Sequence, residues 1–261
     1  MPEDRTDLPR NAGGRTSAEH SSSPKPGKRP RAAAEPHMTQ AMENYLLSIY
    51  LVEEQGQRVT NQQLVEQLRR VPATEHLGTS LPSVSGMLRR MDGEGLIQVG
   101  ENRDIGLTAH GKTLAESIIR RHRLAARMIV DLLGVPLHMV NGEAHRLEHA
   151  MSEGLEERIK AVLGNPTTDP FGQPIPGGGY VQPKGVITLD KAHAGARMIV
   201  DRIPEDDEAL VQYLADRGVL PGVEVTVEEV APYRGVATLK VGDHTAIVGY
   251  AVASRIRVRP A

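Results

Sequence analysis

The chain lacks cysteine entirely among its 261 residues, which excludes disulfide bonds, thiolate metal ligands and cysteine nucleophiles. Aromatic side chains are also scarce, with no tryptophan and one phenylalanine. Binding of single-stranded nucleic acid by base stacking needs aromatic platforms, so this mode of binding is disfavoured. Histidine, aspartate, glutamate and asparagine are the side chains that remain for holding a metal ion.

Long apolar runs are absent as well. No segment reaches the roughly 18 apolar residues that suggest a membrane-spanning helix, and the polar N-terminus has no hydrophobic stretch of the signal-peptide type. We therefore expect a cytoplasmic protein without a membrane partner. The formal net charge of −2 gives no overall nucleic-acid signal, so any DNA-binding surface must be local.

Two polar segments separate the parts of the chain that are expected to fold. Residues 1–37 are rich in Ser, Pro, Gly, Arg and Lys and have almost no large apolar residues, which predicts a disordered tail. Residues 165–185 are dense in Pro and Gly and are predicted to form a linker. The rest of the chain is long enough for domains with proper cores.

Residues 38–108 have the pattern of a winged helix-turn-helix DNA-binding domain. Apolar residues recur at helical spacing from Thr39, and Thr60 stands three residues before Gln63, a capping-box spacing. A third helix is predicted from Leu81 to Glu94. Two short alternating segments follow, joined by a polar turn, and they resemble the β-hairpin that forms the wing of such a domain.

The connection between the second and third predicted helices is unusual. Residues 69–79 far exceed the three or four residues of an ordinary turn in this motif. Either the loop is an insertion that skirts the DNA, or the helix boundaries differ from those predicted. His76, next to Glu75 in this loop, could bind metal, but we favour the interpretation that the two form a surface pair.

The start of the third helix is the expected DNA-reading element. In a helix-turn-helix, the first residues of the second helix of the motif meet base edges, while nearby basic side chains hold phosphates. The DNA-binding candidates at this end and at the tip of the hairpin are Ser80, Pro82, Ser83, Ser85, Arg89, Arg90 and Arg103. An ordinary three-helix subdomain with a solvated arginine pair is the alternative.

Residues 109–164 are predicted to form a helical domain of two long helices, about 109–133 and 136–163, joined at Gly134. Residues 186–261 contain one short helical segment and several alternating segments, a pattern that fits a small β-barrel. The predicted fold class is therefore mainly α with a small β part.

The segment His145-Arg-Leu-Glu148-His149 places two imidazoles and a carboxylate on one face of a predicted helix, because residues three and four apart are neighbours there. The apolar stripes would pack His122, on the preceding helix, and Asn44, on the first helix, beside this segment. Imidazole and oxygen ligands suit Mn, Fe, Co or Zn, and the lack of a thiolate favours Mn(II) or Fe(II).

Different functions are compatible with this spacing. In a zinc peptidase the two histidines would bind zinc and Glu148 would act as general base, but the chain shows no dedicated substrate domain. In a metal sensor all three side chains would be ligands. A third hypothesis is a metal-binding adaptor whose β-barrel docks a proline-rich peptide, with few aromatic residues to line its groove: Tyr213, Tyr233 and Tyr250.

Three segments carry a specific resemblance to a known family: Arg121-His-Arg-Leu-Ala125, Glu143-Ala-His-Arg-Leu-Glu-His149 and Asp169-Pro-Phe-Gly-Gln-Pro-Ile-Pro176. Together they resemble the diphtheria-toxin-repressor family of metal-dependent transcriptional regulators. The C-terminal part looks like the SH3-like domain of its longer members. The resemblance implies a homodimeric, metal-activated repressor of metal-ion homeostasis that binds double-stranded operator DNA and has no small-molecule substrate. It also implies that residues 109–164 hold both the metal and the dimer interface.

The resemblance also implies a set of ligand positions. Glu148 and His149 match family ligands unchanged, and His122 matches a family histidine. His145 stands where iron-responsive members have Cys and manganese-responsive members have Glu, while Asn44 replaces a Met or an Asp respectively.

Asp206 lies where the SH3-like domain of the family contributes a ligand. Ala126 and Asn141 stand where a Glu and a His of the ancillary site are expected. A complete second site of the iron type is therefore not expected from the resemblance.

Overall fold

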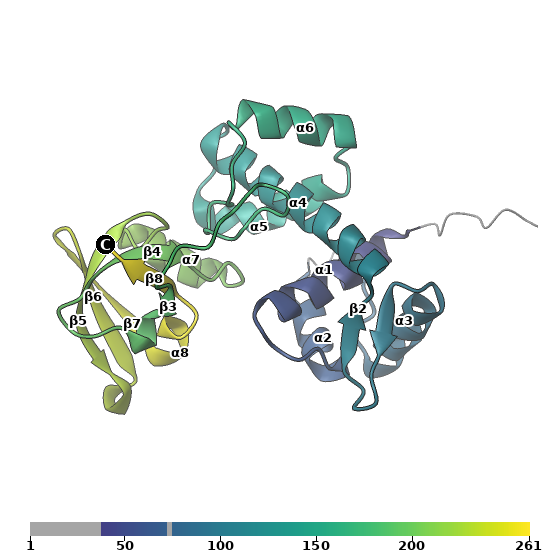
Figure 1. Cartoon of the computed structure of the whole chain (residues 1–261), viewed down its shortest axis with the longest axis horizontal. Helices are drawn as coiled ribbons and strands as arrows, with labels where there is room; N and C mark the ends of the chain where they lie inside the picture. Colours follow the sequence, from purple (N-terminus) through teal and green to yellow (C-terminus); the bar gives the residue numbers. More distant parts are fainter. Residues whose placement is uncertain (1–37, 72–74) are drawn as a thin grey trace, which may run out of the picture. The chain divides into compact units, whose positions relative to one another are not determined.

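The computed structural model describes residues 38–71 and 75–261, in which a helical part is followed by an antiparallel sheet (Figure 1). The tail predicted over residues 1–37 lies outside the described residues. Within the described ranges, no helix is both long and apolar enough to cross a bilayer. The predicted fold class, mainly α with a small β part, is confirmed.

The N-terminal part is the predicted winged helix-turn-helix. It consists of α1 (Gln40–Glu54), α2 (Asn61–Leu68), α3 (Leu81–Gly93), β1 (Ile97–Val99) and β2 (Ile105–Leu107). Thr60 and Gln63 form the predicted capping box at the start of α2, and the hydroxyl of Ser80 caps α3. Strands β1 and β2 pair antiparallel as the predicted hairpin. The sequence therefore placed the helices correctly, and the long connection between α2 and α3 is a true insertion.

Helix α4 (Ala109–Asp131) contributes to two hydrophobic cores. Its first half places Ile118 and Ile119 in the core that also contains the buried residues of α1, α2 and α3. Its second half places Leu124 and Ile129 in the core of the following part. Because an α-helix rises 1.5 Å per residue, the 23 residues of α4 extend about 35 Å. One uninterrupted helix therefore joins the DNA-binding part to the part that follows.

The region after α4 differs from the single helix predicted over residues 136–163, and that prediction is wrong. The structure has a short 3-10 helix (Leu137–Met139), α5 (Val140–Glu148) and α6 (Glu153–Val162). His149 is the C-cap of α5, and the hydroxyl of Ser152 accepts the N–H of Leu155 to start α6. A serine that caps a new helix competes with continuation of the previous one. The chain therefore breaks directly after His149.

Part of the predicted linker, residues 165–185, packs against the folded parts. Phe171 is 1% exposed, and its backbone carbonyl accepts the N–H of Ile203. A Cβ at Gly172 would lie 2.1 Å from the carbonyl oxygen of Asp201, so glycine is needed where the two backbones approach. This stretch is thus anchored to the chain just beyond β4 (Arg197–Arg202).

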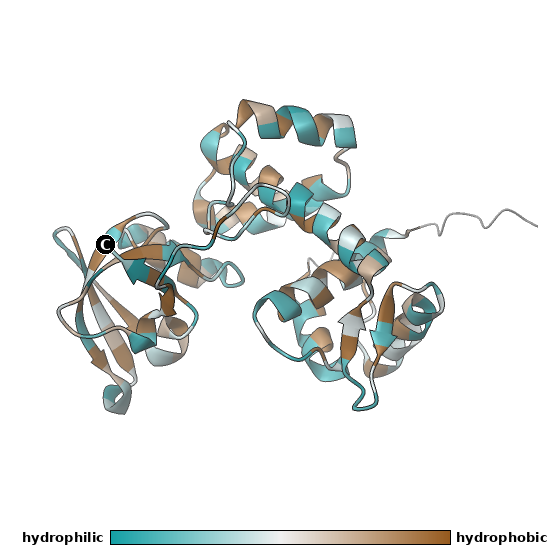
Figure 2. Cartoon of the chain, viewed as in Figure 1, coloured by the Kyte–Doolittle hydropathy of each residue, from teal (hydrophilic) through white to brown (hydrophobic). Residues whose placement is uncertain are grey.

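The C-terminal part is a six-stranded antiparallel sheet with the order β3-β8-β4-β5-β6-β7. Besides β4, its elements are β3 (Ile187–Thr188), α7 (Glu208–Asp216), β5 (Glu224–Ala231), β6 (Val236–Val241), β7 (His244–Gly249), α8 (Tyr250–Ala253) and β8 (Arg257–Pro260). Hydrophobic and hydrophilic residues alternate along β5 and β6, so one face of each strand is buried (Figure 2). The predicted SH3-like part is confirmed.

Gly111, near the start of α4, is a second position where a side chain has no room, since a Cβ there would lie 1.8 Å from the carbonyl oxygen of Leu96. We expect Gly111→Ala to lower the free energy of unfolding, measured by urea denaturation, by roughly 1–3 kcal/mol because the backbone must shift. In the control Gly86→Ala, in α3, the new Cβ meets no atom within 4 Å. The control should raise the free energy of unfolding by up to about 1 kcal/mol; equal stability of the two variants would contradict the expectation.

Candidate metal centre

The predicted constellation of His145, Glu148 and His149 is assembled at the end of α5. The spacing of three and four residues puts all three side chains on one face, with His149 at the C-cap. His145 is 6% exposed and Glu148 is fully buried. Nδ1 of His145 and Nε2 of His149 lie 3.1 Å and 3.3 Å from Oε1 of Glu148. This end of α5 is therefore a tight cluster of nitrogen and oxygen donors.

Several buried nitrogen and oxygen atoms in and around this cluster make no hydrogen bond within the described part of the chain. They are Oδ1 of Asn44, Nε2 of His145, Oε1 of Glu148 and Nε2 of His149. An unsatisfied buried polar atom costs roughly 1–3 kcal/mol, so such a group is expected to serve another purpose. A divalent cation would satisfy imidazole nitrogens and oxygens together. The residues present therefore fit a bound metal ion.

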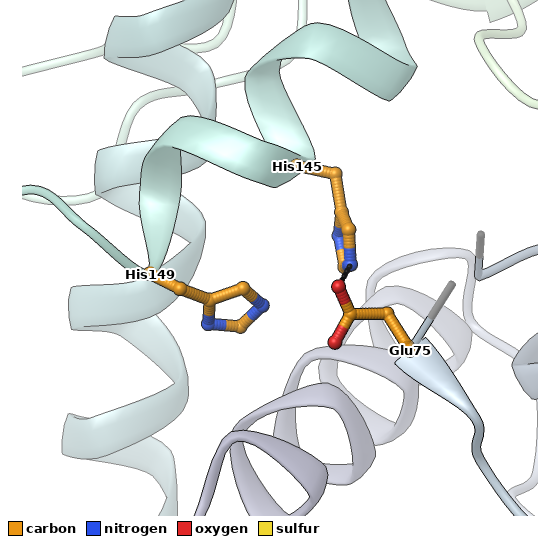
Figure 3. Close-up of side chains that lie close together, drawn as sticks. All are labelled: Glu75, His145 and His149. Carbon is orange, nitrogen blue, oxygen red and sulfur yellow. Dashed lines mark ion pairs between the residues drawn. The ribbon is translucent and has the colours of Figure 1, made fainter. Parts of the chain in front are cut away.

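The connection between α2 and α3 adds a carboxylate that the sequence analysis did not assign to the site. Figure 3 shows Glu75 facing His145 and His149, with Oε1 of Glu75 3.8 Å from Nε2 of His145. One ligand atom from each of these three residues lies within 4.8 Å of the others. Oε2 of Glu75 accepts the side-chain amide of Asn44 at 3.3 Å, which brings α1 to the same place. The side chain of Glu75 is 14% exposed, so it is not the surface residue that was expected, whereas His76 beside it is exposed.

Two further contacts orient the ligand candidates. Nδ1 of His149 lies 2.5 Å from Oε2 of Glu43, on α1, and Nδ1 of His122, on α4, lies 2.5 Å from Oε2 of Glu148. A carboxylate that accepts the Nδ1 proton of a histidine fixes the tautomer and leaves Nε2 free to bind a metal. Glu43 therefore aims His149 into the cluster.

The charges of the cluster are strongly coupled. Burial raises the pKa of Glu148, but the facing imidazoles of His122 and His145 outweigh burial and lower this pKa to about 2. Burial lowers the pKa of His122, but the carboxylate of Glu148 outweighs it, and the net pKa is raised. The pKa of His149 is likewise lowered by burial and raised on balance by Glu43 and Glu148. Glu148 is therefore an anion at neutral pH, and the imidazoles of His122 and His149 hold their protons more firmly than a free histidine does.

The structure does not bring every predicted metal ligand into this cluster. His122 lies beside Glu148, and with His145 these residues form a second group whose ligand atoms are within 4.8 Å of one another. Asp206 is instead paired with Arg70 and Arg255, which neutralise its carboxylate. Asp206 does not join the cluster because Arg70 and Arg255, from distant segments of the chain, hold its carboxylate.

Glu43 and Glu75 were not predicted to contact the candidate ligands. Glu43 directly precedes the predicted ligand Asn44, so its place on α1 was a usable signal. Glu75 offered only its position in an unexpectedly long loop. In the folded chain both carboxylates contact residues of α5, at sequence separations that no local pattern reveals.

The predicted DNA-binding residues lie around the start of α3 and the hairpin. Ser80, Pro82 and Ser83 are exposed there, whereas Ser85 is half-buried. Arg89 is exposed and its Nε donates to the carbonyl of Ser85, while Arg90 pairs with Glu94 at 2.9 Å. Arg103 is exposed between β1 and β2, with a φ of +60°. These residues lie on α3 and in the hairpin, and none of them belongs to the cluster at the end of α5.

Comparison with models of protein families matches nearly all of the described chain. Residues 37–105 match the model described as iron dependent repressor, N-terminal DNA binding domain. Residues 108–177 match iron dependent repressor, metal binding and dimerisation domain, and residues 187–260 match the FeoA domain. The middle match contains the cluster residues of α4 and α5.

Individual proteins give the same result. The iron-dependent repressor IdeR of Mycobacterium tuberculosis is 37% identical over 230 residues, which cover 83% of this chain and 95% of that protein. The diphtheria toxin repressor of Corynebacterium glutamicum is 35% identical over 199 residues, covering 71% and 82%. A solved structure of a manganese-dependent transcriptional repressor in complex with manganese matches with a TM-score of 0.72 and 30% identity, covering 84% of this chain and 99% of that one.

The pKa directions predict how metal binding depends on pH. A histidine must lose its proton to bind a metal, and the raised pKa of His149 means that this proton is held above the ordinary 6.5. We expect the apparent affinity for Mn²⁺, measured by calorimetry, to fall with decreasing pH already above 6.5, by about tenfold per pH unit for each proton displaced. Glu148 should contribute nothing to this dependence, because its pKa is about 2. A constant affinity between about pH 8 and about pH 6 would refute the expectation.

Proposed function

The chain belongs to the iron-dependent repressor family, and from this premise we propose that it is a homodimeric, metal-dependent transcriptional repressor that binds operator DNA in the cytoplasm. The observation that carries the proposal is a group of buried nitrogen and oxygen atoms without hydrogen-bond partners. It joins α1, in the winged helix-turn-helix, to α5, in the helical part that follows. A DNA-binding element and a metal-binding element that are joined by one helix buried in both cores have the parts of a metal-controlled switch.

We assign the metal to His145, Glu148 and His149, with Asn44 as a ligand from α1 and His122 in the adjoining position. The bound ion would supply positive charge that satisfies nitrogen and oxygen donors from different helices at once. Without a thiolate the donor set is hard, which favours Mn(II) or Fe(II) over Zn(II) or Co(II). The matched relatives are named for iron and for manganese, in keeping with this choice. Asp206 is left out of the site, because Arg70 and Arg255 neutralise its carboxylate.

The residues of this chain suggest how occupancy reaches the DNA-binding part. Asn44 and Glu43 belong to α1, which is part of the N-terminal core, whereas His145, Glu148 and His149 belong to the end of α5. An ion held by both helices favours the arrangement in which the side chains of α1 and α5 that bind it lie close together. Metal raises DNA affinity to the extent that it binds this arrangement better than the alternatives.

For the operator we propose that Ser80, Pro82 and Ser83 face base edges, since they lie exposed at the start of α3. Arg89 and Arg103 would hold phosphates on either side. Ser85 and Arg90 have smaller roles in this proposal, because Ser85 is half-buried and Arg90 is engaged by Glu94.

The peptidase hypothesis has no support from the cluster, and we infer that the protein is not an enzyme of this type. A general base needs a pKa near the working pH, whereas that of Glu148 is lowered to about 2. Glu148 is also fully buried, so no substrate reaches it.

The adaptor hypothesis is likewise weak, because the aromatic residues of the SH3-like part are not available as a groove. The hydroxyl of Tyr213 donates to the carbonyl of Ile247, and Arg217 lies over the Tyr213 ring at 5.6 Å. Tyr233 is 85% exposed and lies in the 3-10 helix (Pro232–Arg234) that connects β5 to β6. A polyproline groove needs several aromatic rings side by side.

We propose that the homodimer forms through apolar residues that the helical domain leaves exposed. These residues belong to the end of α4, the 3-10 helix, α5 and α6, and they are Leu132, Leu133, Met139, Leu147, Leu155 and Val162. Exposed apolar side chains that recur over neighbouring helices are typical of a protein–protein interface.

The metal assignment predicts that His149→Ala abolishes metal-dependent repression. Because the variant loses one nitrogen ligand, we expect its Mn²⁺ affinity to fall at least about 100-fold. Addition of Mn²⁺ should no longer strengthen binding to the protein's own promoter region in a fluorescence anisotropy titration. His244→Ala, which removes an exposed histidine in β7, is the control and should behave as the wild type. Identical Mn²⁺-dependent DNA binding by His149→Ala and wild type would refute the assignment.

The dimer surface predicts that Leu147→Lys produces monomers. Leu147 is 38% exposed on α5, and a lysine there would place a charge in the apolar interface. In sedimentation velocity experiments we expect the dimer dissociation constant to rise at least about 100-fold. Val181→Lys, at a position that is 83% exposed outside the helical domain, is the control and should leave the dimer intact. An intact dimer in both variants would place the interface elsewhere.

A further inference from the structure

The loop between α2 and α3 is connected at one end to the metal cluster and at the other to the DNA-reading helix. Glu75 contacts the cluster, and Ser80, five residues later, caps α3. Between them, the hydroxyl of Tyr45 on α1 donates to the carbonyl of Gly78 at 3.4 Å. A Cβ at Gly78 would lie 2.8 Å from the side chain of Ser83, so this stretch runs tightly against the start of α3. The stretch from Glu75 to Ser80 is therefore in contact with the cluster at one end and with α3 at the other.

The carboxylate of Glu75 has one oxygen engaged and one directed at the cluster. Oε2 accepts hydrogen bonds from the side-chain amides of Gln40 at 2.7 Å and Asn44 at 3.3 Å. Oε1 lies 3.8 Å from the unsatisfied Nε2 of His145. In an octahedral site with bonds of about 2.1 Å, two ligand atoms lie about 3.0 Å apart in adjacent positions and about 4.2 Å apart in opposite positions. The observed separation falls within this range before any ion has drawn the ligands inward.

The backbone next to Glu75 supports a defined role for this position. His76 has a φ of +50°, a left-handed conformation that residues other than glycine rarely adopt. Such a conformation is strained and persists where the surroundings hold it. The residue that follows the carboxylate is thus held in an unfavourable conformation while Glu75 points at two imidazoles.

We propose that Glu75 is a ligand of the metal ion, so that the ion ties the turn of the helix-turn-helix directly to α5. This inference rests on the proposed function, because it concerns the same ion. With the ion bound, His145 and His149 on α5 and Glu75 in the turn share one coordination sphere. Without it, the side chain of Glu75 is held by the amides of Gln40 and Asn44. Metal binding therefore biases the position of α3 itself, in addition to that of α1.

The test compares Glu75→Gln with the control Glu66→Gln, which neutralises an exposed carboxylate on α2. A glutamine at position 75 still accepts the amide of Asn44 but loses the negative charge. By calorimetry with Mn²⁺ alone, Glu75→Gln should bind at least about tenfold more weakly than the wild type, and Glu66→Gln equally well. Glu75→Asp keeps the charge on a shorter side chain and should retain an intermediate affinity.

Hydrogen exchange supplies a readout that affinity alone does not. On addition of saturating Mn²⁺, amides of residues 75–83 and of α5 should gain protection in the wild type, whereas Glu75→Gln should gain it in α5 only. Unchanged Mn²⁺ affinity together with wild-type protection of residues 75–83 in Glu75→Gln would overturn the proposal. Equal thermal melting of the metal-free variants would show that the substitution does not unfold the protein.

The two assignments fail in different ways. If His149→Ala binds Mn²⁺ as tightly as the wild type, the site itself is misplaced and the proposed function loses its metal centre. If His149→Ala loses binding while Glu75→Gln behaves as the wild type, the metal site stands and only the role of Glu75 is refuted.

Discussion

A single buried carboxylate, Glu148, determines how this metal-binding region is built. An anion with no exposed surface is costly unless cationic or hydrogen-bonding groups surround it. Here His122 from α4 and His145 from α5 provide them, and their effect outweighs burial, which leaves the Glu148 pKa at about 2. This one charge therefore lies against side chains of both α4 and α5, whose apolar residues also share a core.

The switch depends on how the helices are shared between the cores. Helix α4 is buried in both, so the two parts cannot separate without exposing its apolar residues. Helix α1 belongs to the N-terminal core, yet its Glu43 and Asn44 reach the ligands of α5 directly or through Glu75. In the proposed switch, metal would therefore act on α1 and on the turn before α3, which contact the cluster, while α4 stays buried in both cores.

Local sequence signals were sufficient for much of the fold and for the part of the candidate metal site that lies on α5. Thr60 and Gln63 marked the start of α2, because capping depends on residues three apart. His145, Glu148 and His149 were found for the same reason, since neighbours on one helical turn are fixed by spacing. The break at Ser152 was missed, because the apolar stripe on either side of it continues with helical period.

The remaining site residues depend on tertiary contacts. Glu43 and His149 are 106 positions apart, and no periodic pattern relates them. Glu75 contacts α1 and α5 from the connection between α2 and α3, and no local sequence pattern reveals these contacts. Asp206 shows a further long-range effect: it lines the same cavity as His122 and His145, but its carboxylate pairs with Arg70 and Arg255, which the sequence does not place beside it. Long-range pairing of charges is the information that a single sequence does not contain.

The all-nitrogen-and-oxygen ligand set has a consequence for oxidative stress. A thiolate ligand can be converted by peroxide to a sulfenic acid or a disulfide, and a sensor that relies on it then loses its metal for reasons unrelated to metal supply. In this chain an imidazole, His145, completes the cluster and no cysteine exists anywhere. Because the chain has no thiol, thiol oxidation cannot remove a ligand from the proposed site.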